Sequence, residues 1–310
     1  MNLKNKKILV TGGNGFLGHA LVPMLKKKGV DVFTFDVKDY NLKKEKEVKK
    51  LLDDSNPNIV IHLAVDGGGI GYMKENPGSV FYNNVVMNTN LMEQSRLKGI
   101  EKFVGIGSVC EYPKITEVPF KERDLWEGYP EETNASYGLS KKMMLVQGQA
   151  YRQQYNFNVI HLLPVNMYGP YDSFNLENSH VIPALIRRMV EAKENKDKEL
   201  VLWGSGNASR EFLYVEDCAK AIINAMEKYD KPEPINIGSG LEVTIKDLAY
   251  KIKDFVGYEG NIVWDVSKPD GQPRRCLDVS KAEQEFGFKA KTNLDKGLKK
   301  TIEWYSSLKK

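Results

Sequence analysis

Two patterns of hydrophobic and polar positions alternate along the first half of the chain. Short apolar runs rich in β-branched residues recur, and longer amphipathic stretches separate them. Runs of the first kind predict buried strands, and stretches of the second kind predict helices. The pattern predicts strands at 7–11, 32–35, 58–64, 102–106 and 159–163, and helices at 19–28, 43–54, 80–98 and 137–155.

Strands that alternate with helices imply a parallel sheet covered by helices on both faces. We therefore expect an α/β fold, a Rossmann-type doubly wound parallel sheet with a smaller mixed α/β substrate lobe. The pattern becomes less regular after residue 170. There it predicts a helix at 179–188, a strand at 200–203, a loop at 204–212, a helix at 215–227 and a strand at 235–237. We assign 1–170 to a dinucleotide-binding domain, with 212–237 returning to it, and 171–211 and 238–310 to the substrate lobe.

Three glycines follow the first predicted strand in a G-x-x-G-x-x-G spacing, at Gly12, Gly15 and Gly18. In such a loop one glycine makes the turn, another lets the backbone approach a pyrophosphate, and the third lets helix and strand pack closely. The N-terminus of the following helix then faces the phosphates. A flexible glycine-rich turn is the alternative, but the strand before and the helix after favour a dinucleotide site.

An aspartate, Asp36, ends the second predicted strand about twenty residues beyond the glycines. A carboxylate at this place accepts hydrogen bonds from an adenosine ribose and repels a 2′-phosphate. It predicts a preference for NAD(H) and makes NADP(H) the less favoured cofactor. A surface aspartate at a strand end is the alternative interpretation.

Ser108, Tyr137 and Lys141 are candidates for catalysis. Tyr137 and Lys141 are four residues apart, so on a helix they share one face. An ammonium group near a phenol lowers the pKa of the phenol, which could then exchange protons near neutral pH. Ser108 follows the strand at 102–106 and could orient the same substrate oxygen. Taken alone, the tyrosine–lysine spacing also fits an aromatic core contact beside a solvated lysine.

Ligands of open α/β sheets bind at the carboxyl ends of the strands. The third predicted strand leads there into Gly67–Gly71, a glycine-rich loop. We expect the cofactor to contact residues at several strand ends and in the glycine loop. These are Gly12, Gly15, Phe16, Leu17, Gly18, Asp36, Asn41, Leu42, Leu63, Ala64, Lys141, Pro164 and Asn166.

Composition excludes several function classes. The chain has 310 residues, 41% hydrophobic and 28% charged, which is typical of a soluble globular protein. A net charge of +4 with scattered lysines gives no support for nucleic-acid or membrane binding. The three cysteines are widely spaced, so no disulfide framework or metal site is expected. No signal peptide or membrane-spanning stretch is visible, and we expect a cytoplasmic protein.

The motifs together resemble the extended short-chain dehydrogenase/reductases that act on nucleotide sugars, and among them the GDP-L-fucose synthases. The glycine loop, Ser108 and the Tyr137–Lys141 pair match the wider family. The narrower match covers nearly the whole chain. Its segments are 107–114, 132–134, 179–188, 203–206, 210–213 and 267–271, and the run Ser-His-Val-Ile-Pro-Ala at 179–184 is specific to that branch.

The resemblance implies a two-domain enzyme, usually a homodimer, that acts on a GDP-linked 4-keto-6-deoxy sugar in polysaccharide biosynthesis. Such enzymes epimerise C3 and C5 and then reduce C4. It implies that Tyr137 is the acid at the C4 oxygen, that Ser108 assists it and that Lys141 tunes it. Cys110 and His180 would be the acid/base pair for epimerisation, because a thiol and an imidazole both exchange protons near pH 7. Arg188, Trp203, Arg210 and Asp270 would hold the GDP-sugar.

The chain departs from the family pattern at three places. Asp36 replaces the basic residues expected for NADPH, Asp66 and the glycines after it change a loop, and Glu111 replaces an apolar neighbour of Cys110. We therefore expect an NAD(H)-dependent oxidoreductase/epimerase that moves hydride at C4 of a GDP-linked sugar. It would be a C4 dehydrogenase or a 4-keto reductase, with or without C3/C5 epimerisation. The alternatives are an NADPH-dependent GDP-L-fucose synthase and a non-catalytic NAD(H)-sensing protein.

Overall fold

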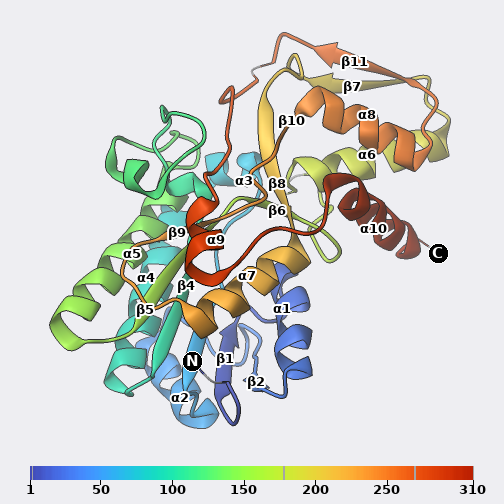
Figure 1. Ribbon diagram of the computed structural model, residues 1–310. Helices are drawn as coiled ribbons and strands as arrows, with labels where there is room; N and C mark the ends of the chain where they lie inside the picture. Colours follow the sequence, from blue (N-terminus) through green and yellow to red (C-terminus); the bar gives the residue numbers. More distant parts are fainter. Residues whose placement is uncertain (2, 177–178, 269, 310) are drawn as a thin grey trace.

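A six-stranded parallel sheet forms the centre of the computed structural model, which describes residues 1, 3–176, 179–268 and 270–309 (Figure 1). Every pair of neighbouring strands in it is parallel, and the strand order is β2-β1-β3-β4-β5-β9. The predicted fold class is confirmed. The strands are β1 (Lys7–Thr11), β2 (Asp31–Phe33), β3 (Ile59–His62), β4 (Lys102–Ile106), β5 (Val159–Pro164) and β9 (Ile235–Ile237).

Helices cover both faces of this sheet. On one face α1 (Phe16–Lys27) packs with α7 (Val215–Lys228) over Ile8 and Val10. On the other face Leu9 packs with α2 (Glu45–Ser55) and α4 (Pro77–Leu97), and α5 (Ala135–Tyr155) lies beside α4. Because both faces are buried, the strands are mainly apolar, and this is why the sequence pattern revealed them.

The strand order reverses at β1. The chain runs from β1 outward to β2, and β3 then pairs with the other side of β1. In open α/β sheets such a switch point leaves a crevice at the carboxyl ends of the two strands, where ligands bind. Here it lies between Thr11 at the end of β1 and His62 at the end of β3.

The remaining elements form a second body with its own hydrophobic core (Figure 1). Two small sheets and three helices contribute to it, and short helices connect the parts. The sheets are β10-β8-β6 and β11-β7, with β6 (Asn166–Tyr168), β7 (Glu199–Trp203), β8 (Ser209–Tyr214), β10 (Glu242–Thr244) and β11 (Asn261–Asp265). The helices are α6 (Val181–Asn195), α8 (Ile245–Val256) and α10 (Leu294–Ser307), and the connecting helices are α3 (Ile70–Glu75), η1 (Val109–Glu111), η2 (Glu122–Trp126) and α9 (Ser280–Phe286). The proposed domain boundaries stay a prediction.

The structure corrects two local expectations. The loop predicted at 204–212 is wrong in its second half, because β8 begins at Ser209 and pairs with β6 and β10. Those partner strands are distant in sequence, so the local glycine and serine content concealed the strand. The second strand is also shorter than predicted and ends at Phe33, which leaves Asp36 in the turn that follows it.

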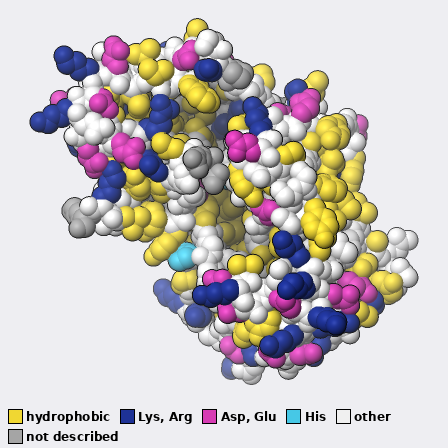
Figure 2. Space-filling model, turned by 180° about the vertical axis from the view of Figure 1, so that it is seen from behind, with side chains coloured by type: hydrophobic (Ala, Val, Ile, Leu, Met, Phe, Trp, Pro, Cys, Tyr) yellow, Lys and Arg dark blue, Asp and Glu magenta, His cyan; other side chains and the backbone are white. Residues whose placement is uncertain are grey.

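Seen from behind, the molecule is hollowed between its lower and upper parts, and hydrophobic side chains lie in the depth of the hollow (Figure 2). None of the helices in the described part of the chain has the length and apolar character needed to cross a membrane.

Candidate active site

The glycine loop packs tightly against the end of β3. Gly12 has a positive φ of 67°, and a Cβ atom there would lie 2.8 Å from the backbone nitrogen of Ala64. At Gly18 a Cβ atom would collide with the backbone of Gly13. The helix α1 starts at Phe16 with no side-chain cap and no acidic residue in its first turn. Its free N–H groups therefore suit the diphosphate of a dinucleotide.

A chain of buried hydrogen bonds lies beneath this loop. The Thr11 hydroxyl is 2.7 Å from Nδ1 of His62, and His62 Nε2 is 2.9 Å from Oδ1 of Asn88. The Asn88 amide donates to the backbone oxygen of Ser140 on α5 at 3.2 Å. Burial lowers the pKa of His62 to about 3, so the ring stays neutral. This network ties the glycine-loop end of the sheet to the helix that carries Tyr137.

The other predicted cofactor residues are spread around the switch point. The carboxylate of Asp36 accepts a hydrogen bond from the backbone nitrogen of Lys38 at 3.3 Å. Asn41 accepts one from the backbone nitrogen of Lys43 at 3.0 Å, and the side chain of Leu42 packs in the core. Leu63 and Ala64 adjoin Gly12, Phe16 and Leu17 form the first turn of α1, and Pro164 and Asn166 lie where β5 passes into β6.

Ser108, Tyr137 and Lys141 come together at the end of β4. Ser108 caps η1 and its Oγ atom accepts a hydrogen bond from the backbone nitrogen of Cys110 at 3.1 Å. The Ser108 side chain also hydrogen-bonds to Tyr137. Lys141 is buried, and its Nζ atom is 5.9 Å from the centre of the Tyr137 ring. Close packing is allowed by Gly138, where a Cβ atom would collide with the backbone oxygen of Cys110.

The structure does not give the lowered tyrosine pKa that the sequence suggested. Burial raises the pKa of Tyr137 above its usual value, and the neighbouring Cys110 and Glu111 side chains add to this effect. The hydrogen bond with Ser108 opposes it. Burial also lowers the pKa of Lys141 to about 8, while Glu111 acts in the opposite direction. Near neutral pH, Tyr137 is therefore a protonated phenol, able to donate a proton.

The predicted substrate residues gather in the second body. Arg188 donates to the backbone oxygen of Val201 on β7. Trp203 ends the same strand, and the relative exposure of this residue is 71%. The carboxylate of Asp270 accepts from the backbone nitrogen of Ser205 at 2.6 Å and from its hydroxyl at 2.7 Å. Asp270 thus shapes a loop, and Pro269 of the same motif lies outside the described residues.

Sequence reasoning missed Arg275, which links the Ser108–Cys110 loop to the predicted substrate residue Arg210. The Nη1 atom of Arg275 lies 3.8 Å from the sulfur of Cys110. Burial and the charge of Arg275 lower the pKa of Arg210 to about 10. The guanidinium of Arg275 also donates to the side chain of Gln272 at 2.8 Å. The two consecutive arginines Arg274 and Arg275, just after the 267–271 segment, were the feature of the sequence that could have revealed it.

His180 comes from the second body, where it precedes α6 as its N-cap residue. Its side chain is exposed, while the surrounding protein lowers the pKa of the imidazole below its usual value. A neutral imidazole can accept a proton. The other two cysteines, Cys218 and Cys276, are buried.

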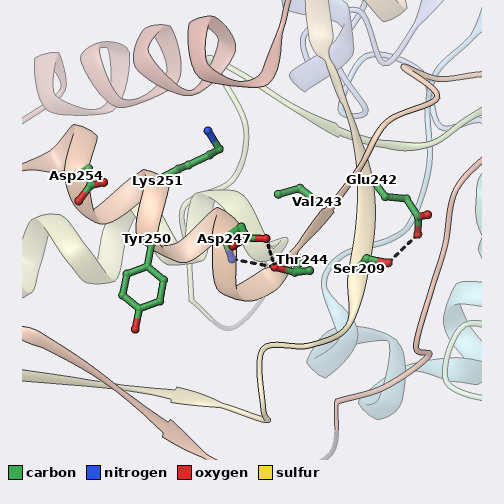
Figure 3. Close-up of a pocket in the computed structure, with 8 residues that line it drawn as sticks. All are labelled: Ser209, Glu242, Val243, Thr244, Asp247, Tyr250, Lys251 and Asp254. Carbon is green, nitrogen blue, oxygen red and sulfur yellow. Dashed lines mark hydrogen bonds between the residues drawn. The ribbon is translucent and has the colours of Figure 1, made fainter.

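A separate pocket of about 550 Å³ lies beside α8 and β10 (Figure 3). Ser209 lines it, and because successive residues of a strand face opposite ways, Arg210 points to the other side. Its lining includes the carboxylates of Glu242, Asp247 and Asp254. They would repel an anionic sugar nucleotide, so this pocket is unsuited to one.

Comparison with known proteins identifies relatives over the whole chain. Residues 8–238 match the model of the NAD dependent epimerase/dehydratase family. The chain is 41% identical to a GDP-L-fucose synthase of Sinorhizobium fredii over 98% of this chain and 97% of that protein. Among solved structures it is similar to a GDP-6-OMe-4-keto-L-xylo-heptose reductase from C. jejuni. That match has a TM-score of 0.93, 29% identity and coverage of 99% of both chains.

The preference for NAD(H) that Asp36 suggested is wrong. A GDP-L-fucose synthetase from Naegleria fowleri, solved with NADP bound, is 30% identical to this chain. Its TM-score is 0.90, over 99% of this chain and 96% of that one. Asp36 lies beyond the end of β2, in a turn where its carboxylate already accepts a backbone hydrogen bond, rather than at the strand end that the sequence suggested.

Proposed function

We propose that this chain, which is an enzyme and belongs to the NAD dependent epimerase/dehydratase family, reduces the C4 ketone of a GDP-linked 4-keto sugar with hydride from NADPH. The observation that carries the proposal is the grouping of Ser108, Tyr137 and Lys141 at the end of β4, on a helix that buried hydrogen bonds connect to the end of β1. Tyr137 is protonated there, as an acid must be before a ketone is reduced.

The residues of the glycine loop fit the cofactor. The uncapped first turn of α1 offers N–H groups to the diphosphate, and Gly12 and Gly18 allow the close packing that positions them. Lys38 is a basic side chain on the turn after β2, and we assign contact with the 2′-phosphate to it. Bound NADPH supplies the hydride that C4 receives.

Three residues take part in the transfer of a proton to the C4 oxygen. The Tyr137 hydroxyl donates its proton to the C4 oxygen as that oxygen gains negative charge, so the ketone becomes an alcohol and Tyr137 a phenolate. Ser108 donates a hydrogen bond to the same oxygen and holds it in place. The Lys141 ammonium, close to the ring, stabilises the phenolate until solvent returns the proton.

We also propose proton exchange at the carbons next to C4, and the contact of Arg275 with Cys110 supports it. The guanidinium of Arg275 faces the Cys110 thiol from the second body. A C4 ketone acidifies the C3 and C5 protons, because the resulting carbanion is an enolate. We assign removal and return of such protons to Cys110 and His180, so that epimerisation accompanies reduction.

The size of the sugar ring substituent is the remaining question about the substrate. Relatives include a GDP-L-fucose synthase and a GDP-heptose reductase, which work on sugars of different size. Gly67 favours the larger one, since it lies beside the catalytic tyrosine with no side chain of its own. A Cβ atom there would be 3.8 Å from Cε2 of Tyr137 and 3.3 Å from Cε of Met73. We propose a GDP-4-keto-heptose as the substrate.

We also propose a homodimer that forms through α4 and α5 and works in the cytoplasm in polysaccharide biosynthesis. Apolar side chains are exposed on these neighbouring helices, among them Leu97, Met143 and Val146. The test of the activity is oxidation of NADPH by the purified protein with a GDP-4-keto-heptose and with a GDP-4-keto-6-deoxyhexose. Turnover of neither sugar would contradict it.

A further inference from the structure

A buried carboxylate lies directly behind the catalytic loop. Glu111 is fully buried, and its Oε1 atom accepts a hydrogen bond from the backbone nitrogen of Ser108 at 2.8 Å. Nε2 of the equally buried His161, on β5, lies 3.1 Å from both carboxylate oxygens. At Gly107 a Cβ atom would collide with both side chains. The pair therefore packs against the backbone that presents Ser108.

The hydrogen bonds define the donor and the acceptor in this pair. A carboxylate accepts only, so the proton of the His161 ring lies on Nε2. Among the described residues Nδ1 of His161 is buried without a partner. A second proton there would be a buried, unpaired donor, which is costly. His161 therefore donates from Nε2 to the carboxylate of Glu111, and the two side chains form one buried pair.

Helix α5 packs directly against Glu111, because a Cβ atom at Gly138 would lie 3.5 Å from the Cα atom of Glu111. Two buried ammonium groups follow one turn further along the same helix. They belong to Lys141 and Lys142, and Glu111 raises the pKa of each against the larger lowering effect of burial. The Nζ atom of Lys142 lies over the ring of Trp126, 4.8 Å from its centre. The other titratable groups around Glu111 are Cys110 and Tyr112 beside it in the chain, Tyr137 on α5 and His161 on β5.

We propose that Glu111, held by His161, is a positioning residue of this active site. Its carboxylate fixes the backbone of Ser108 and supplies the negative charge that keeps Lys141 an ammonium group at working pH. The inference rests on the proposed reductase function, because it assigns to Lys141 a charge that the reaction needs.

A purely structural pair would hold the loop and nothing more. Its loss would then reduce stability, and activity would fall by the same factor at every pH. A charge that supports Lys141 predicts a different outcome, because Lys141 has a pKa of about 8 and titrates within the measurable range.

The first test is Glu111→Gln, which keeps the size of the side chain and an acceptor for Ser108 but removes the charge. The alkaline limb of the pH profile of kcat should move to lower pH by roughly one unit. The loss of Tm relative to the unmodified protein should also be larger at about pH 6.5, where Lys141 is charged, than at about pH 9.5, where it is largely neutral.

A matched control is Glu122→Gln. Glu122 also has a carboxylate that accepts a backbone hydrogen bond, from Asn236 at 2.9 Å, and burial raises its pKa. Its loss should lower Tm without moving the alkaline limb. If Glu111→Gln fails to fold, the double variant Glu111→Gln/His161→Gln carries the test, since two amides can hydrogen-bond to each other without a charge. It should show the same shift.

The proposal is overturned if the limb stays in place, or if the loss of Tm is equal at both pH values. Failure of the proposed function is a separate result. In that case the unmodified protein reduces no GDP-4-keto sugar, while the comparison of Tm values still decides whether Glu111 supports the charge of Lys141.

Discussion

The guanidinium of Arg275 lies 3.8 Å from the sulfur of Cys110, although the two residues are 165 positions apart. Cys110 belongs to the loop that also carries Ser108, and Arg275 belongs to the segment that follows Asp270. This contact brings a cation of the second body to the thiol of the loop that carries Ser108. The backbone oxygen of Arg275 accepts a hydrogen bond from the nitrogen of Glu211 at 3.1 Å, next to Arg210 in β8. Two guanidinium groups in this region suit the diphosphate of a GDP-sugar.

Replacing Arg275 should weaken the use of substrate. We expect Arg275→Ala to lower kcat/KM for the GDP-sugar by roughly 10- to 100-fold, as loss of a hydrogen bond to a charged group does. The dissociation constant of NADPH should not change. Steady-state kinetics and a fluorescence titration of the cofactor provide the measurement.

The matched control for this variant is the preceding residue. Arg274 is exposed and pairs with Glu242 on the surface, so Arg274→Ala should leave kcat/KM nearly unchanged. Equal losses in both variants would contradict the assignment of Arg275 to the substrate.

Replacing Tyr137 should stop reduction and spare cofactor binding. Tyr137→Phe removes the proton that the C4 oxygen receives, and we expect kcat to fall by roughly 100- to 10,000-fold. NADPH should bind as before. Tyr155→Phe, at an exposed position of the same helix, should have full activity. Normal turnover by the Tyr137→Phe variant would rule out the proposed mechanism.

A side chain at Gly67 should select the smaller sugar. Gly67→Val places methyl groups next to Tyr137 and Met73, so we expect kcat/KM for a GDP-4-keto-heptose to fall about tenfold more than for a 6-deoxyhexose. Gly78→Val is the control, because a Cβ atom there meets nothing within 4 Å. Equal losses of kcat/KM for both sugars would show that Gly67 does not determine the size of the accepted sugar.

Lys38 should distinguish the two nicotinamide cofactors. If its ammonium group binds the 2′-phosphate, Lys38→Ala should weaken NADPH binding by roughly tenfold and leave NADH binding unchanged. Isothermal titration with each cofactor measures this. Lys26→Ala, which removes a lysine from the last turn of α1, is the control. An equal effect of Lys38→Ala on both cofactors would place the phosphate elsewhere.

Lys102 should make stability depend on pH. Its buried ammonium group donates to the backbone oxygens of Met226 and Tyr229 at the end of α7, and burial lowers its pKa to about 8 from 10.5. The folded protein therefore binds fewer protons than the unfolded chain between these values, and its stability relative to Lys102→Met should rise with pH across that window.

Urea unfolding at several pH values measures this effect. Near neutral pH we expect Lys102→Met to cost about 2–4 kcal/mol, because it leaves buried carbonyl groups without a donor. Lys98→Met removes an exposed lysine that pairs with Asp53 and should change little. A stability difference that does not vary with pH would contradict the lowered pKa of Lys102.

Local sequence determined the frame of this protein. The strands β1, β4 and β9 have the predicted bounds, since each is a short, mainly apolar and buried segment. The glycine loop and the shared helix face of Tyr137 and Lys141 could also be recognised from the sequence. The backbone geometry of a turn and of a helix determines which residues at such spacings lie close together.

Only the tertiary structure decided how the site is completed and charged. The strand β8 depends on pairing with segments remote in the chain, and so does the contact of Arg275 with Cys110. The raised pKa of Tyr137 depends on burial and on Glu111, whose partner His161 comes from another strand. Solvent exclusion and the distances between charges arise from the packed fold. Spacing along the chain therefore showed which groups meet within the glycine loop and on α5, whereas packing decided the remote contacts and the proton affinities.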